Sequence, residues 1–182
     1  MNNSNIPGRS PWHRVRGSAF STTRRLANMR SVGHFRWMAN IEDFRVIVEF
    51  PAAWGDMDAL AHINNVAYFR YFENARVAYF ERTQIMGSAE MQGGMKGVGP
   101  ILANASCRFK APMTYPDQVR VGIRAKDLLK DRFTMEFAVF SESLQRIAAA
   151  GEGLIVAYDY DRLQKAEAPE RWRRAIAEVE GW

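Results

Sequence analysis

The 182-residue chain has one cysteine, three histidines and no long hydrophobic run. The single Cys107 excludes an intramolecular disulfide framework and fits a reducing compartment, so we expect a cytoplasmic protein. Its place inside a predicted strand favours a buried structural thiol over a nucleophile. The histidines lie far apart in the sequence and have no cysteine partners, so we predict no metal site. Because no apolar stretch approaches the roughly 18 residues of a spanning helix, we expect no membrane span.

The first 40 residues contain no acidic side chain. They hold seven arginines and show no sustained periodicity, so residues 1–40 are expected to be a basic, mostly disordered extension. Without these arginines the chain has 18 basic residues (25 − 7) against 20 acidic ones, a net charge of −2 instead of +5. Three explanations stay open: an over-long start, with Met38 or Met29 as the first residue; a transit-like peptide; or an arm that contacts nucleic acid or an anionic surface. The arm is the least favoured of these explanations, and nucleic acid is not an expected partner.

Residues 41–182 suit one domain, because 47% hydrophobic content is enough for a core. Residues 44–50 alternate strictly between two faces and predict a strand. Four later segments alternate in the same way and predict a largely antiparallel sheet; they are residues 101–110, 118–128, 132–140 and 147–160. On one face, the first of these four would carry Ile101, Ala103, Ala105, Cys107 and Phe109. In the last of them, Gly151 and Gly153 suggest a bend or bulge.

A helix is predicted over residues 66–82, which contain no Gly or Pro and are apolar around most of the helix circumference. That pattern is typical of a buried helix. Asn64 or Asn65 would cap its start, and Gly87 would end it. The Met- and Gly-rich residues 88–99 are expected either to line a ligand tunnel or to form a simple crossover. A C-terminal helix would begin near Pro169.

Five polar residues gather just before the predicted buried helix: Asp56, Asp58, His62, Asn64 and Asn65. The unpaired N–H groups and the dipole at a helix start favour negative charge there. The arrangement is therefore a natural site for stabilising an oxyanion. Asp56 is expected to order the loop.

Residues 56–73 resemble a family signature. They read D-M-D-A-L-A-H-I-N-N-V-A-Y-F-R-Y-F-E, which is similar to the pattern of the 4-hydroxybenzoyl-CoA thioesterase-like family of hotdog-fold acyl-CoA thioesterases. That pattern has D-x-D, then H-x-N-N, then a Tyr and an acidic residue along the helix. The resemblance covers residues 43–162.

The resemblance implies an α+β hotdog fold, in which a five-stranded, largely antiparallel sheet wraps around one buried helix, here with a C-terminal helix added. It also implies an enzyme that hydrolyses an acyl-CoA thioester to free acid and coenzyme A. Such domains commonly pair edge to edge, so we expect a homodimer or homotetramer with active sites between subunits. No resident cofactor is expected, because coenzyme A is part of the substrate.

By the same match, Asp58 is the catalytic carboxylate, acting as nucleophile or general base; a purely structural loop carboxylate is the alternative. Backbone N–H groups near Asn65 and Val66 would form the oxyanion hole, which is typically worth roughly 3–4 kcal/mol. His62 would orient the site or bind the substrate carbonyl. Glu73 is the reserve candidate, because a helix carboxylate is catalytic in another branch of hotdog thioesterases. The expected substrate-binding side chains are Asn64, Tyr68, Tyr71 and Phe72.

Two other functions compete with hydrolysis. Hotdog enoyl-CoA hydratases or dehydratases place a His five residues after an Asp, whereas His62 lies four residues after Asp58 and six after Asp56. The second is a non-catalytic acyl-CoA sensor whose basic tail contacts DNA, but the tail shows no helix-turn-helix pattern. Exposed basic residues should mark the entry of coenzyme A, and five are available without a preference among them: Arg108, Lys110, Arg124, Lys126 and Arg132.

Overall fold

The computed structural model describes residues 40–86 and 94–182. The predicted extension with Met29 and Met38, Gly87, and half of the Met- and Gly-rich connection lie outside the described residues. No helix within the described ranges is long and apolar enough to cross a membrane. In chain order the elements are η1 (Ile41–Asp43), β1 (Val46–Pro51), η2 (Trp54–Asp56), α1 (Asn65–Thr83), β2 (Val98–Phe109), β3 (Gln118–Lys126), β4 (Arg132–Ser141), β5 (Arg146–Asp159), β6 (Gln164–Lys165) and α3 (Glu170–Glu180).

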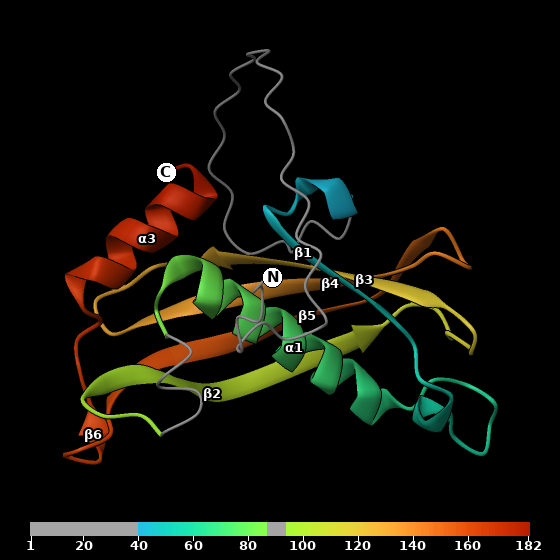
Figure 1. The fold of residues 1–182 in the computed structure, drawn as a ribbon, viewed down its shortest axis with the longest axis horizontal. Coiled ribbons are helices and arrows are strands. Elements are labelled where there is room, and N and C mark those ends of the chain that lie inside the picture. The colour runs from blue at the N-terminus through green and yellow to red at the C-terminus, as the bar shows by residue number, and fades with distance from the viewer. Residues whose placement is uncertain (1–39, 87–93) are drawn as a thin grey trace, which may run out of the picture.

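The five long strands form one antiparallel sheet in the order β1-β3-β4-β5-β2, and the two-residue β6 pairs with β5. Figure 1 shows this sheet curled around α1, with α3 beyond the end of α1. Tyr79 of α1 donates its hydroxyl hydrogen to Glu180 at the end of α3 over 2.7 Å. The expected hotdog fold is therefore confirmed, and β1 and β2 are its two edges.

Helix α1 is buried as predicted. Nine of its 19 residues are buried, and the ring of Phe72 stacks on Phe137 of β4 with centroids 4.6 Å apart. Each large apolar side chain buried in this way contributes roughly 1.5–3 kcal/mol to stability. The helix ends at Thr83 and not near Gly87, because Gln84 takes the left-handed conformation (φ 53°) and its Nε2 donates to the Glu81 carbonyl over 2.7 Å. The predicted end at residue 82 is thus confirmed within one residue, whereas the cap is Gln84 and not the predicted Gly87.

The first strand begins later than predicted. Asn40 caps the short helix η1, and Ile41 and Phe44 then pack with Ala138 on the outer face of the sheet. A Cβ atom on Gly122 would lie 2.5 Å from the Phe44 ring, so glycine is required beneath it. Strict alternation over residues 44–50 predicts that Phe44 shares a face with the inward residues of β1. It does not, because it packs on the outer face of the sheet.

The alternation predicted for β2 is interrupted. Leu102 lies opposite Ile155 and Ala105 lies opposite Gly153, so the register shifts around Ala103. Directly opposite residues share a face in an antiparallel ladder. Leu102 and Ala105 therefore point to the same side as Cys107, and the predicted single face through Ala103 was wrong because of the bulge.

The irregularity predicted within β5 is present, but it lies at Ala148, where the register with β4 shifts between the pairs Val139–Ala149 and Phe140–Ile147. Gly151 and Gly153 keep regular pairing. Their role is spatial. A Cβ atom on Gly151 would lie 2.6 Å from the ring of Phe72, and one on Gly153 would lie 3.2 Å from Leu102. The absence of a side chain at Gly151 lets α1 approach the sheet closely.

Candidate active site

The loop before α1 is a tight hairpin that presents Asp58. Met57 and Ile63 form an isolated bridge, and the Asp58 N–H donates to the His62 carbonyl over 2.8 Å. Asp58 Oδ1 accepts the Leu60 N–H over 2.8 Å. Its Oδ2 has no hydrogen-bond partner in the described part of the chain. The backbone thus fixes one carboxylate oxygen and leaves the other available.

The start of α1 offers one open donor. Asn64 Oδ1 accepts the Val66 N–H over 2.9 Å, and the Asn64 carbonyl accepts the Ala67 N–H over 2.9 Å. The Asn65 N–H has no partner among the described residues. Of the two backbone groups predicted for an oxyanion hole, that of Val66 is occupied by the cap and that of Asn65 is free. Of the two predicted capping residues, Asn64 and Asn65, it is Asn64 that caps α1.

A cavity of about 420 Å³ joins this helix start to the end of β2. The ring of Tyr68 meets Phe109 edge to face, with centroids 5.1 Å apart. Burial raises the pKa of Tyr68, so its hydroxyl stays protonated at neutral pH. The cavity brings together four of the predicted site residues and five others; they are Asp58, His62, Asn65 and Tyr68, with Ile63, Phe109, Lys110, Ala111 and Pro112.

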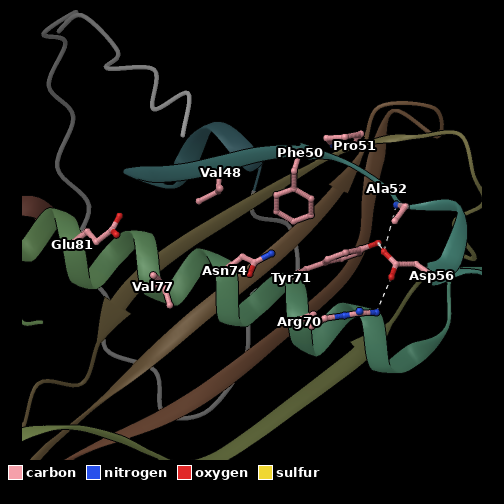
Figure 2. A pocket seen from close by; sticks show the side chains of 11 residues that line it. Val48, Phe50, Pro51, Ala52, Asp56, Arg70, Tyr71, Asn74, Val77 and Glu81 are labelled. Atoms are coloured by element: carbon pink, nitrogen blue, oxygen red, sulfur yellow. Dashed lines mark hydrogen bonds and ion pairs between the residues drawn. The ribbon is translucent and has the colours of Figure 1, made fainter. Parts of the chain in front are cut away.

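Five predicted residues do not line this cavity; Asn64 and Val66 adjoin it at the helix cap, and the other three lie farther along α1. Tyr71 lines a second cavity, of about 510 Å³, between β1 and α1 (Figure 2). Phe72 is buried against Phe137 in the core. Glu73 has a side chain 60% exposed and pairs with Arg76 over 3.2 Å. The structure does not bring Tyr71, Phe72 or Glu73 into the cavity that holds Asp58.

The cavity wall after β2 was missed by sequence reasoning. From the sequence, Lys110 is named only as one of five basic residues, and Ala111 and Pro112 are not predicted as site residues. Burial, with the neighbouring charge of Arg108, lowers the pKa of Lys110. No local pattern could have found this wall, because it lies more than 40 residues from Asp58 in the sequence and is brought there by the pairing of β2 with β5.

Cys107 should react slowly with alkylating agents. Burial raises the pKa of its thiol to about 12, and only the thiolate is nucleophilic. At pH 8 we expect iodoacetamide to modify the folded protein about 10³-fold more slowly than a free cysteine of pKa ~8.5, as followed by mass spectrometry. The same chain in urea should react at the ordinary rate. Cys107 is only half-buried, short of the predicted burial. Comparable rates in the folded and unfolded chains would contradict the raised pKa of its thiol.

Comparison with known proteins agrees with this geometry. The model of the thioesterase-like superfamily matches residues 52–176. A Pseudomonas aeruginosa protein of known structure is 27% identical, with a TM-score of 0.66 over 76% of this chain and 94% of its own. A Thermus thermophilus thioesterase, solved with coenzyme A and Zn, is 29% identical, with a TM-score of 0.64 over 78% of this chain and 98% of its own.

A third structure, a DHNA-CoA thioesterase from Staphylococcus aureus, is 20% identical and shares the fold, with a TM-score of 0.64 over 74% of this chain and 90% of its own. Within residues 40–86 and 94–182 of the present chain, no three His, Cys, Asp or Glu side chains are grouped closely enough to hold a metal ion.

The family match covers well over half of the chain, and both the sheet and the buried helix agree with solved thioesterases. The chain therefore belongs to the thioesterase-like superfamily and is a hotdog-fold thioester hydrolase.

Proposed function

We propose that this hydrolase cleaves an acyl-CoA thioester to free acid and coenzyme A in the cavity at the start of α1. The observation that carries the proposal is that the Asp58 carboxylate and the Asn65 N–H lie in the same cavity. Neither Asp58 Oδ2 nor the Asn65 N–H has a partner in the described part of the chain. Thiol release from a panel of acyl-CoA esters tests it. Tight acyl-CoA binding without release from any ester would overturn it.

Asp58 supplies the carboxylate in either of two routes. As a general base it takes a proton from water, which attacks the thioester carbonyl carbon. As a nucleophile it attacks that carbon itself and forms a mixed anhydride that water then hydrolyses. In both routes the C–S bond breaks, and the coenzyme A thiolate leaves and takes up a proton. The developing oxyanion accepts the Asn65 N–H at the positive end of the helix, an interaction typically worth about 3 kcal/mol.

Lys110 is the best-placed cation for the phosphates of coenzyme A. It lines the cavity, and Arg108 lies two residues before it on β2. Three other basic candidates do not line this cavity and bond to carboxylates on or near the sheet: Arg124 and Lys126 to Glu136, and Arg132 to Asp131.

The edge strand β2 is the proposed dimer contact. Residues 101–106 of this strand are exposed on both faces, and Phe109, which lines the catalytic cavity, is 46% exposed. A long exposed edge with apolar side chains is a site for pairing with another strand. Pairing of two copies along β2 would cover Phe109 and close the cavity against the second subunit.

Ala105→Asp should therefore separate the subunits. Ala105 is exposed in a single chain, so an Asp there is tolerated by the fold but would be buried at a β2 contact. Light scattering should give twice 20.8 kDa for the wild type and a single chain for the variant, with thioesterase activity lost. Leu163→Asp, at an exposed turn near β6, is the matched control and should stay dimeric. A dimeric Ala105→Asp protein would exclude this contact.

A further inference from the structure

Asp56 connects the catalytic loop to α1. It lies in η2, two residues before Asp58, and is only 9% exposed. Its Oδ2 accepts the hydroxyl hydrogen of Tyr71 over 2.9 Å, and its Oδ1 accepts from Arg70 Nη2 over 2.7 Å (Figure 2). Its backbone carbonyl accepts the Asn64 N–H over 2.8 Å. One residue thus holds the end of the loop and the side of the helix together.

These bonds close a ring. The path runs from the Asp56 carbonyl to Asn64, along the first two turns of α1 to Tyr71, and back through the Tyr71 hydroxyl to the Asp56 carboxylate. Asn64 directly precedes the free Asn65 N–H, and Asp58 follows Asp56 by two residues. Because the ring includes two turns of a rigid helix, it fixes the direction in which the preceding loop enters α1.

We propose that Asp56 is a positioning residue for thioester hydrolysis, which holds Asp58 and the Asn65 N–H at a fixed separation through Asn64 and Tyr71. The inference rests on the proposed function. Asp56 does not line the cavity that contains Asp58; it lines the second cavity, between β1 and α1. It therefore acts through other residues. Misplacing a reacting group by 1 Å can cost about 10²-fold in rate. The hydrogen bonds of Asp56 to Tyr71, Arg70 and Asn64, here called the Asp56 clamp, therefore affect turnover although Asp56 does not touch the substrate.

The Tyr71 hydroxyl stays protonated at neutral pH and so remains a hydrogen-bond donor. Burial and the neighbouring Asp56 carboxylate raise the pKa of Tyr71, so its hydroxyl keeps its proton. A hydrogen bond to an ionised acceptor is stronger than one between neutral groups. Arg70 contributes less to the clamp, because its side chain is 61% exposed and water screens the ion pair.

Asp56→Asn and Tyr71→Phe test the proposal. The first change puts an amide in place of the carboxylate and turns a donor toward Tyr71 or Arg70. The second keeps an aromatic ring against Phe50, 5.1 Å away, and removes only the hydroxyl. We expect Asp56→Asn to lower kcat about 10- to 100-fold with KM within about threefold of wild type. Tyr71→Phe should lower kcat less, and the double variant should fall short of the product of the two effects because they share one bond.

A second readout does not need catalysis. In NMR hydrogen exchange, the Asn64 amide proton should exchange at least about tenfold faster in Asp56→Asn, because its acceptor is the Asp56 carbonyl. Tyr71→Phe should shift this rate in the same direction. If the wild type releases no thiol but both variants speed this exchange, the clamp is supported and the proposed function fails.

The matched controls are Glu180→Gln and Tyr79→Phe. They break the same kind of bond at the other end of α1, where the Tyr79 hydroxyl donates to Glu180 over 2.7 Å. They should lower Tm but leave kcat and the Asn64 exchange rate unchanged. Two results would overturn the proposal: wild-type kcat and Asn64 exchange in both Asp56→Asn and Tyr71→Phe, or an equal loss of kcat in the controls at equal loss of stability.

Discussion

Asp58→Asn should lower the kcat for thiol release by two or more orders of magnitude, within the 10²- to 10⁴-fold range of a lost general acid or base. Asparagine has the size of aspartate, and its Oδ1 can still accept the Leu60 N–H that now lies 2.8 Å from Asp58 Oδ1. The loop therefore keeps its shape, while the carboxylate that we propose to activate water or attack the carbonyl is removed. Release of coenzyme A can be followed with a thiol reagent, and acyl-CoA binding can be measured separately.

The matched control is Glu73→Gln. Glu73 lies on the same helix, is largely exposed and pairs with Arg76 over 3.2 Å, away from the cavity of Asp58. Its loss should leave kcat within a few-fold of wild type, because an exposed ion pair contributes little. If Glu73→Gln is inactive while Asp58→Asn is active, the catalytic carboxylate is Glu73. Circular dichroism and Tm should show both variants folded.

Gly151→Ala should be the most damaging small substitution in the sheet. The added Cβ would lie 2.6 Å from the ring of Phe72 and closer still to the Ser106 carbonyl of β2. Either α1 or β2 must move, and overpacking of this kind costs about 3 kcal/mol. For a domain of this size that loss lowers Tm by roughly 6–12 °C. The free energy of unfolding in urea is the direct measurement.

Gly153→Ala is the control for this substitution. Its new Cβ would meet only the side chains of Leu102 and Phe137 within 3.3 Å, and side chains can adjust where a backbone carbonyl cannot. The free energy of unfolding should change by less than about 1 kcal/mol, because alanine also restricts the unfolded chain. Equal losses at both positions would show that the approach of α1 at Gly151 is not what requires glycine.

Local sequence determined the parts of this protein that depend on periodicity. The helix was predictable because 17 consecutive residues, 66–82, lack Gly and Pro and are apolar around most of the helix. The strands were predictable from alternation, apart from the register shifts near Ala103 of β2 and Ala148 of β5. Asp58, His62 and Asn65 were predictable as neighbours because they occupy one short loop at the helix start, and that loop resembles a known signature.

Tertiary structure decided everything that depends on residues distant in sequence. Tyr68 and Tyr71 are three residues apart on α1, yet Tyr68 lines the cavity of Asp58 and Tyr71 bonds to Asp56 beside the second cavity. Composition cannot separate them, because which side a tyrosine serves depends on the strand that packs against it. Likewise Lys110 reaches the cavity of Asp58 only because β2 is paired in one register with β5. Register and packing are set by long-range contacts, which local patterns do not contain.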